Sequence, residues 1–401
     1  MAQGKVRARD LGVPFDGTPG PLNAITDVTG LEVGHTTLIS GSGPLVVGKG
    51  PVRTGVTAIL PRGRSGPDTV FAAWFTLNGN GEMTGTTWIE ESGMMEGPVL
   101  ITNTHSVGVV RDAVLRWMLK TNRLMLFGLP VVAETFDGLL NDDKGFHVTA
   151  EHALAALEGA RSGAVAEGNV GGGTGMICHG FKGGIGTSSR RLPDAAGGYT
   201  VGVLVQCNSG ARRRLTIAGA PVGQDLTDLR VCSMTGANIA RQWLRGIRRC
   251  TAAGGAAVGA ALEPDVHPDI PEGLGSIIIV VATDAPLLPH QLKRIATRAS
   301  LGVGRVGGLG ENSSGDIFLA FSTANRGTSA DTGLVRPTML PNDRIDALFE
   351  ATVQATEEAI VNALVAAETM TGADDLRVYE LPHDRLVELL RKYNRVAAPS
   401  R

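Results

Sequence analysis

The chain has 401 residues, of which 43% are hydrophobic and only 4% aromatic, so aliphatic side chains must fill a sizeable core. With 37 basic and 39 acidic residues the formal net charge is −2, which excludes a protein that binds nucleic acid or an anionic membrane mainly by charge. The 55 glycines follow no collagen-like period, and they favour a compact α/β enzyme with tight turns over a helical bundle.

Short apolar runs bounded by turn residues predict strands throughout the chain. The predicted strands are 23–28, 31–35, 54–60, 70–77, 98–103, 130–134, 199–206, 277–282 and 317–322. Apolar residues at helical spacing predict helices at 107–120, 149–160, 235–248 and 289–298, one from Asn342 or Asp343 to about 370, and a short one within 381–392. Mixed strands and helices without a repeat predict a layered α/β domain.

The four cysteines are Cys178, Cys207, Cys232 and Cys250, and none forms a C-x-x-C pair. In so long a chain they do not suggest a disulfide framework, which favours a reducing compartment. The N-terminal residues lack the apolar stretch of a signal peptide, and no window reaches the roughly 18 apolar residues of a membrane span. We therefore expect a cytoplasmic protein without a membrane partner.

Three further segments have unusual composition. Residues 163–187 are the richest in glycine, but they lack the G-K-[ST] ending of a phosphate loop, so closely packed or flexible turns are the preferred interpretation. The basic cluster Arg212-Arg213-Arg214 is interpreted as a solvated strand or turn edge. Residues 224–270 are interpreted as a long, flexible connection.

Polar residues stand at the ends of several predicted strands. They are Asn103, Glu134, Asn208 and Ser276, with Ser313-Ser314-Gly315-Asp316 before another strand. Such residues often converge on one rim of a sheet, where binding sites are built. The alternative is ordinary strand termination by polar residues, which is the better explanation for any one position.

Ser276 lies between a glycine-rich turn and the most apolar predicted strand, and the local pattern alone favours a plain turn residue. The sequence has no H-E-x-x-H, no spaced Cys/His set and no G-x-S-x-G motif, so neither a metal enzyme nor a histidine-activated serine is supported. Chain cleavage before Ser276 would supply a base, because the freed α-amine, with a pKa of roughly 7.7–8.0, would lie beside the hydroxyl. Gly275 suits such cleavage because it lacks a Cβ.

Eight longer stretches carry a family resemblance. They are PGPLNAITDV (19–28), VGHTTL (33–38), NGNGEMTGTTWIEESG (78–93), ITNTHSVGVVRDAV (101–114), VAETFDGLLND (132–142), TVGVLVQCN (200–208), EGLGSIIIVVATDAPLLPHQ (272–291) and SSGDIFLAFSTAN (313–325). Through them nearly the whole chain resembles the DmpA-type family of self-processing N-terminal serine aminopeptidases. That family includes the L-aminopeptidase/D-amidase/D-esterases and the β-peptidyl aminopeptidases.

The resemblance implies an α+β fold, a four-layer αββα sandwich shared with ornithine acetyltransferases and superficially similar to N-terminal nucleophile hydrolases. It implies one peptidase domain, 1–401, that cleaves itself between Gly275 and Ser276 into an α subunit (1–275) and a β subunit (276–401). Small peptides, amides or esters with a free N-terminal amine are the expected substrates, without cofactor or metal. Four αβ units are expected to form a homotetramer.

The resemblance also implies residue roles. Ser276 is the expected nucleophile, which forms an acyl-enzyme later released by water. Asn208 matches the oxyanion-hole asparagine, and Glu134 the carboxylate that holds the substrate amine. Ser314 and Asp316 match the pair that orients the nucleophile, although some relatives have glutamate at the position of Asp316.

Two departures from the family pattern leave alternatives open. Phe136 stands where the family often has tyrosine, so a hydrogen bond near the nucleophile and the substrate is lost. The segment 224–270 is long for the family and precedes the expected cleavage site. An acyltransferase related to ornithine acetyltransferase is one alternative, although those enzymes use threonine as the new N-terminus. A non-catalytic member of the fold is the other.

Overall fold

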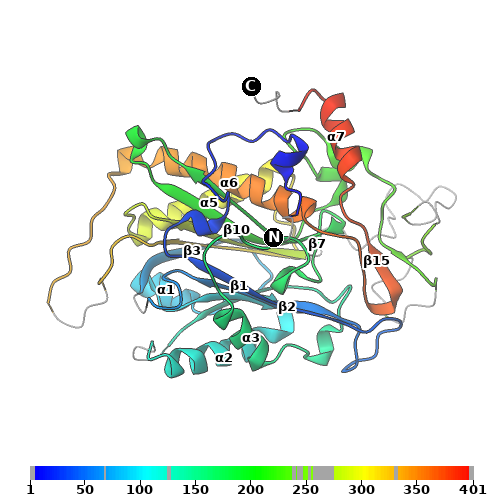
Figure 1. The fold of residues 1–401 in the computed structure, drawn as a ribbon, viewed down its shortest axis with the longest axis horizontal. Helices are drawn as coiled ribbons and strands as arrows, with labels where there is room; N and C mark the ends of the chain where they lie inside the picture. The colour runs from blue at the N-terminus through cyan, green and yellow to red at the C-terminus, as the bar shows by residue number, and fades with distance from the viewer. Residues whose placement is uncertain are drawn as a thin grey trace.

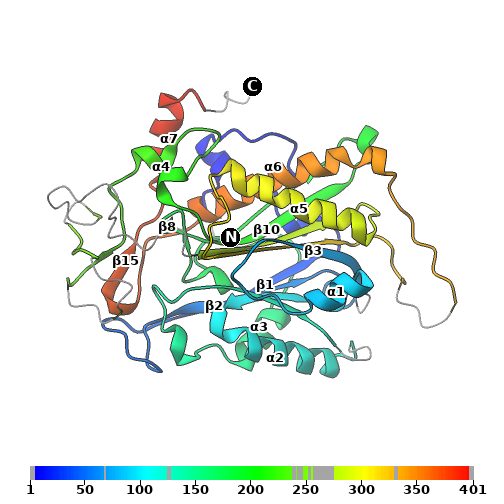
Figure 2. The same ribbon diagram turned by 180° about the vertical axis from the view of Figure 1, so that it is seen from behind.

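Two β-sheets lie face to face between two layers of helices (Figures 1 and 2). This arrangement is seen in a computed structural model. It describes residues 5–66, 69–123, 128–236, 241, 247–251, 254–255, 275–328 and 333–396. The expected four-layer αββα sandwich of the α+β class is confirmed.

The larger sheet has six strands in the order β4-β3-β13-β12-β10-β9. Their bounds are Met94–Met95, Val70–Gly79, Ser314–Ser322, Gly275–Thr283, Thr200–Asn208 and Gly184–Arg191. Only β12 and β13 are parallel, and the other neighbours are antiparallel. Consequently the start of β12 lies beside the start of β13 and the end of β10.

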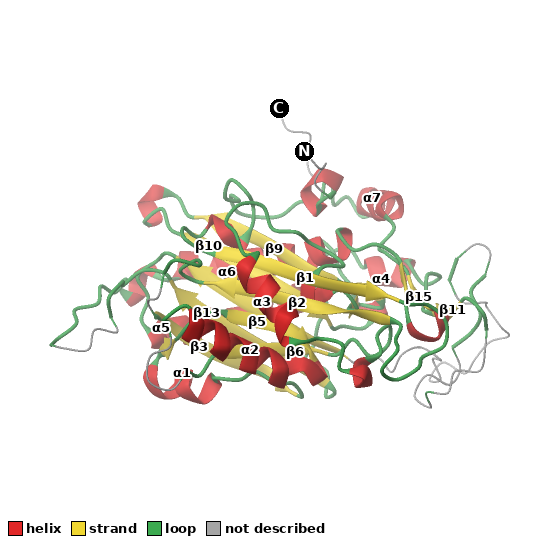
Figure 3. Cartoon of the chain, turned by 60° about the horizontal axis from the view of Figure 1, so that its bottom comes forward, coloured by secondary structure: helices red, strands yellow, loops and turns green. Residues whose placement is uncertain are grey.

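The smaller sheet has the order β1-β2-β5-β6 (Figure 3). Its strands are Glu32–Ser40, Val52–Leu60, Val99–Asn103 and Val131–Thr135, with β5 and β6 parallel. Two smaller groups complete the strands: the hairpin β7 (Ile177–Cys178) and β8 (Phe181–Lys182), and a sheet of β11 (Cys232–Ser233), β15 (Leu376–Val378) and β14 (Met370–Thr371).

Helices cover the outer face of each sheet (Figure 1). Helices α2 (Val107–Lys120) and α3 (Ala150–Glu158) pack on the smaller sheet, whereas α5 (Pro289–Arg305) and α6 (Asp346–Val365) pack on the larger one. The shorter helices are α1 (Thr86–Ser92), α4 (Val222–Asp225) and α7 (His383–Lys392). No helix of the described ranges is both long and apolar enough to span a bilayer.

The central strand β12 is apolar on both faces because both faces are covered. Its odd-numbered residues, such as Ile277 and Ile279, pack toward α5 and α6. Its even-numbered residues, such as Ile278 and Val280, pack between the two sheets. Each of these side chains contributes on the order of 1.5–3 kcal/mol by burial, so the continuous run anchors β12 in the core.

Several predicted boundaries differ from the structure. The strand predicted at 23–28 is wrong: Ile25–Asp27 forms a short 3₁₀ turn, because the Asp27 carboxylate accepts the Leu22 and Ala24 backbone N–H groups at 3.0 and 3.1 Å. Residues 342–344 form a separate turn before α6, so neither residue predicted as its cap fills that position. The helix predicted at 235–248 lies largely outside the described residues.

The prediction about cysteines is wrong. Cys178 is bonded to Cys207, and Cys232 to Cys250. Residues 29 and 18 positions apart in sequence meet because the hairpin β7–β8 folds onto β10 and because Arg249 forms a bridge with Ser233 of β11. Such pairing is decided by the tertiary fold rather than by Cys spacing. Disulfides are typical of oxidising compartments, so they weigh against the reducing compartment predicted from the sequence.

The interpretation of the basic cluster as solvated is wrong for Arg212. Its side chain is buried, and its guanidinium donates to the carbonyl groups of His179 and Leu226, each at 2.9 Å. The guanidinium carbon also lies 3.2 Å from the centroid of the Phe181 ring. Carbonyl acceptors and an aromatic face together replace the water that a buried cation loses.

Candidate active site

Ser276 is the second residue of β12, and the strand register fixes its neighbours. It lies opposite Asn208 of β10 and opposite Gly315 of β13. The Gly315 backbone N–H donates to Ser276 Oγ at 3.1 Å. Both Ser276 and Asn208 are 5% exposed, so the hydroxyl and the carboxamide are buried side by side at one end of the sheet.

The pleat separates the predicted site residues between two faces of the larger sheet. Ser276 and Asn208 share the face of Ile278 and Leu204, which pack between the sheets. Ser314 and Asp316 share the face of Phe318, which packs toward the helices. If Ser314 and Asp316 orient the nucleophile as predicted, they do not do so by direct contact with the Ser276 hydroxyl. Any such effect must pass through the main chain of β12.

Ser314 and Asp316 form a buried pair beside that main chain. Ser314 Oγ donates to Asp316 Oδ1 at 2.6 Å, and both residues are 1% exposed. Burial raises the pKa of Asp316 to about 6, and nearby Glu311 adds to the rise, while hydrogen bonds from Ser314 and the Ile277 backbone oppose it. The carboxyl group thus contacts the residue that directly follows Ser276.

Gly275 has no space for a side chain. A Cβ placed on it would lie 1.9 Å from the Asn208 carbonyl oxygen and 3.1 Å from Ser209 Cα. Both are backbone atoms, which cannot turn aside as a flexible side chain can. Only glycine fits next to Ser276 without displacing β10.

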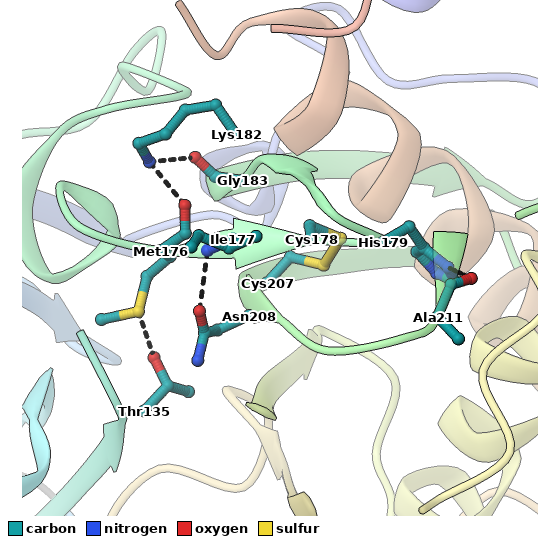
Figure 4. Close-up of a disulfide and its surroundings, with 10 residues drawn as sticks. All are labelled: Thr135, Met176, Ile177, Cys178, His179, Lys182, Gly183, Cys207, Asn208 and Ala211. Atoms are coloured by element: carbon teal, nitrogen blue, oxygen red, sulfur yellow. Dashed lines mark hydrogen bonds between the residues drawn. A yellow bond between two sulfur atoms is a disulfide. The ribbon is translucent and has the colours of Figure 1, made fainter. Parts of the chain in front are cut away.

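Two hydrogen bonds to backbone groups fix the Asn208 carboxamide. Its Oδ1 accepts the Ile177 N–H at 2.7 Å, and its Nδ2 donates to the Phe136 carbonyl at 2.8 Å (Figure 4 shows the first of these). A donor on one side and an acceptor on the other leave one orientation of the amide. The second hydrogen on Nδ2 is not used by these contacts.

Glu134 is the next-to-last residue of β6 in the smaller sheet and is 3% exposed. Its Oε1 accepts the Glu82 backbone N–H at 3.0 Å, and its Oε2 accepts the Thr104 hydroxyl in a short hydrogen bond. Burial raises the pKa of Glu134, and these two hydrogen bonds oppose the rise. The carboxylate is therefore largely desolvated and already oriented, as a binding group for an ammonium should be.

Gly81 lies between Glu134 and Gly315, the neighbour of Ser276 on β13. A Cβ on Gly81 would be 3.1 Å from Gly315 Cα and 3.3 Å from Glu134 Oε1. The adjoining residue Asn80 holds the start of β13, since its Nδ2 donates to the Ser313 carbonyl at 2.8 Å. This turn therefore brings the end of the smaller sheet against the larger one.

Phe136 and Asn103 occupy different surroundings. Phe136 is 36% exposed, and its backbone carbonyl accepts a hydrogen bond from the Asn208 carboxamide. Asn103 instead belongs to a buried polar cluster, because its Nδ2 donates to Asp137 Oδ1 at 3.4 Å. Burial raises the pKa of Asp137 to about 7. The strand-end residues therefore do not all converge on one rim. Ser276 and Asn208 lie side by side, whereas Asn103 lies in the cluster around Asp137.

Sequence reasoning missed several contacting groups. Thr104 and the Glu82 backbone hold Glu134, and Lys182 lies behind Asn208, buried within the hairpin β7–β8. For Lys182, the available signal in the sequence was a lone lysine within the glycine-rich stretch 163–187. Of the two interpretations of that stretch, closely packed or flexible turns, the structure shows close packing at Gly172, where a Cβ would lie 2.2 Å from Gln206 Oε1. Among the described residues, no group of three or more His, Cys, Asp or Glu side chains could hold a metal ion.

The chain is similar to known peptidases along nearly its whole length. The model of peptidase family S58 matches residues 23–378. The β-peptidyl aminopeptidase BapA of Sphingosinicella microcystinivorans is 55% identical over 393 residues, which cover 98% of this chain and 93% of that protein. BapA of Sphingosinicella xenopeptidilytica is 49% identical over 392 residues, covering 96% and 91% respectively.

A solved structure agrees with these relatives. It is the L-aminopeptidase D-Ala-esterase/amidase of Ochrobactrum anthropi, described as a prototype of the serine aminopeptidases with a variant of the N-terminal nucleophile hydrolase fold. Its TM-score to this chain is 0.83 at 45% identity, with 98% of this chain and 99% of that one covered. The family resemblance and the fold predicted from the sequence motifs are confirmed.

Proposed function

The chain belongs to peptidase family S58, and we propose that it is a self-processing aminopeptidase whose nucleophile is Ser276. Its relatives make it a hydrolase of the serine aminopeptidase class. The observation that carries the residue assignment is the strand register, which sets Ser276 opposite Asn208 and directly after a glycine that no larger residue can replace without displacing backbone.

Self-processing begins with attack of Ser276 Oγ on the Gly275 carbonyl carbon. An ester bond forms to Oγ while the Gly275–Ser276 peptide bond breaks, and the proton of Oγ goes to the departing nitrogen. Water then hydrolyses the ester, which leaves a carboxylate on Gly275 and a free α-amine on Ser276. The products are the subunits 1–275 and 276–401.

In the processed enzyme the α-amine of Ser276 is the general base for its own hydroxyl, since its unperturbed pKa of roughly 7.7–8.0 suits proton transfer near neutrality. The hydroxyl attacks the substrate carbonyl, and the unused Asn208 N–H donates to the oxyanion. The leaving amine takes the proton, and water hydrolyses the acyl-enzyme. Ser314 and Asp316 position the α-amine from the other face of the sheet.

Glu134 selects substrates with a free N-terminal amine. Its desolvated carboxylate pairs with the substrate ammonium across Gly81, at a fixed distance from Ser276. The half-exposed Phe136 ring contacts the substrate side chain nearby. Because two relatives are named β-peptidyl aminopeptidases, we propose peptides and amides with an N-terminal β-amino acid as the preferred substrates.

The assembly proposed is a homotetramer of αβ units, which light scattering of the purified protein would measure. A cytoplasmic location stays a prediction, and the two disulfides favour an oxidising compartment over it.

The test compares Ser276→Ala with Ser313→Ala, a matched change at a serine on the neighbouring loop. Wild type and Ser313→Ala should hydrolyse p-nitroanilides of β-amino acids faster than those of L-α- or D-amino acids, whereas Ser276→Ala should hydrolyse none. Activity in Ser276→Ala would refute the nucleophile assignment. Products formed with an added amine acceptor would reveal acyl transfer in place of hydrolysis.

A further inference from the structure

Lys182 is a fully buried lysine whose ammonium donates hydrogen bonds to backbone carbonyl groups. Its Nζ donates to the carbonyls of Met176 at 2.7 Å, Gly183 at 2.8 Å and Gly173 at 3.4 Å. In the described part of the chain no ion pair joins Lys182 to a carboxylate. An unpaired buried charge costs stability, so an apolar residue would be the cheaper occupant of this position.

Three carbonyl acceptors require three donors, which an ammonium has and a neutral amine lacks. Burial lowers the pKa of Lys182 well below its ordinary value, the positive charge of Lys5 lowers it further, and the charge of Asp137 opposes both effects. The arrangement of acceptors therefore favours the charged form against the effect of burial.

One of these acceptors belongs to the peptide group that holds Asn208. The Met176 carbonyl and the Ile177 N–H are the two ends of the Met176–Ile177 peptide. Lys182 binds the carbonyl end, and the N–H end donates to Asn208 Oδ1 at 2.7 Å (Figure 4). A continuous chain of hydrogen bonds thus runs from the buried ammonium to the carboxamide.

The surrounding covalent structure keeps this chain in register. Cys178 follows Ile177, Cys207 precedes Asn208, and a disulfide joins the two cysteines. A Cβ on Gly183 would lie 2.5 Å from the Cys207 carbonyl oxygen, so the hairpin packs directly on β10. The hairpin can hardly shift relative to Asn208 while these contacts persist.

We propose that Lys182 is a positioning residue for catalysis, whose charge polarises the Met176–Ile177 peptide and thereby strengthens Asn208 Nδ2–H as a donor to the oxyanion. Hydrogen bonds in a chain polarise one another, and a cation at one end adds to the dipole of each following group in the same sense. This inference rests on the proposed oxyanion role of Asn208. It adds a residue that touches neither substrate nor nucleophile.

The expected effect is moderate. Loss of a whole oxyanion donor typically costs about 100- to 1,000-fold in kcat. Polarisation along a chain changes each bond by about 10–30%, so removal of the charge should lower kcat by about 2- to 8-fold. KM should stay nearly unchanged, because the charge acts on the tetrahedral intermediate and not on the bound substrate.

The experiment is a double-mutant cycle on the processed enzyme, with Lys182→Met, Asn208→Ala and the double variant. The matched control is Arg212→Met, which removes another buried cation from carbonyls of the same hairpin turn but not from the Met176–Ile177 peptide. We expect Lys182→Met to lower kcat in the wild-type background and to have no effect beside Asn208→Ala. Lys182→Arg, which keeps the charge, should recover much of the loss, and Arg212→Met should change kcat by less than about 2-fold.

Equal losses from Lys182→Met in both backgrounds, or no loss in either, would overturn the inference but leave the proposed function intact. An Asn208→Ala variant with wild-type kcat would overturn both. If Lys182→Met does not fold, ¹⁵N NMR of Lys182 Nζ in the wild-type enzyme takes its place. Three attached protons at the pH of the assay would support the charge, and two would refute it.

Discussion

Glu134→Gln tests how the enzyme recognises the N-terminal amine. The substitution keeps the size of the side chain and removes its charge. Because Glu134 is 3% exposed and already holds two hydrogen bonds, the carboxylate needs no rearrangement to bind an ammonium. The loss of kcat/KM in Glu134→Gln should therefore reflect the missing charge pair between this side chain and the substrate ammonium.

The magnitude follows from Coulomb's law. Two unit charges about 4 Å apart interact by about 4 kcal/mol at an effective dielectric constant of about 20. Part of this is offset by desolvation of the substrate ammonium, so we expect kcat/KM to fall by about 100- to 1,000-fold. The matched control Glu82→Gln removes an exposed negative charge from the adjoining turn, and it should change kcat/KM by less than about 3-fold.

The assay compares an amino-terminal substrate with its des-amino analogue in both enzymes. Wild type should prefer the amino substrate strongly, whereas Glu134→Gln should hydrolyse both at similar low efficiency. If Glu134→Gln keeps the wild-type preference for the amine, another group binds the ammonium and the assignment is wrong.

Folding should not explain the loss. Because burial raises the folded-state pKa of Glu134, the stability linked to its protonated form is complete below the unfolded pKa and is lost as the pH rises through the folded pKa. At pH 7 the ionised side chain therefore destabilises the fold. Glu134→Gln should lower the free energy of unfolding by no more than about 1 kcal/mol, the value of one lost hydrogen bond.

Four further predictions concern the neighbouring groups. The pKa of Asp316 is about 6 and that of the α-amine near 8, so the slope of log(kcat/KM) against pH should steepen from 1 to 2 below about pH 6. Asp316→Asn should keep a slope of 1 there, and a variant with the same profile as wild type would refute a role for this carboxylate. Gly275→Ala should slow self-cleavage severely, because its Cβ would meet the neighbouring strand's carbonyl oxygen at 1.9 Å, and a normal time course on denaturing gels would refute this. Asn208→Ala should lower kcat by about 100- to 1,000-fold at nearly constant KM, and an effect confined to KM would contradict an oxyanion role. Replacing Cys178 and Cys207 by alanine should lower the free energy of unfolding by about 3–4 kcal/mol, as expected for a cross-link 29 residues apart, and urea unfolding with an unchanged midpoint would contradict it.

Local sequence pattern predicted most of what depends on local burial. The run Ile277–Ala282 becomes the central part of β12, and the helix predicted at 107–120 has the bounds found for α2. Patterns of this kind succeed because a strand covered on both faces must be apolar throughout, and a helix on a sheet must show one apolar stripe.

The parts that were missed depend on contacts distant in sequence. The disulfide of Cys178 and Cys207 forms because the hairpin β7–β8 packs against the end of β10, which no spacing rule reveals. Lys182 was not singled out because its three carbonyl partners are brought together by turns of the glycine-rich stretch. The site residues were predicted from family motifs, since strand ends alone do not say which ends meet.

The separation of Ser276 from Ser314 and Asp316 illustrates the same limit. All three were predicted near one strand end, and the register does bring them there. The side-chain alternation then places the hydroxyl on one face and the carboxyl pair on the other. Which face a residue occupies follows from its strand's register, and that register is set by neighbouring strands.

The central claim is that Ser276 becomes the N-terminus of a second chain. Intact-mass measurement of the purified protein tests it most directly. Wild type should give two masses, for residues 1–275 and 276–401, and Ser276→Ala a single mass for 1–401. An active wild-type enzyme with one uncleaved chain, or a Ser276→Ala variant that still divides at this bond, would contradict the account.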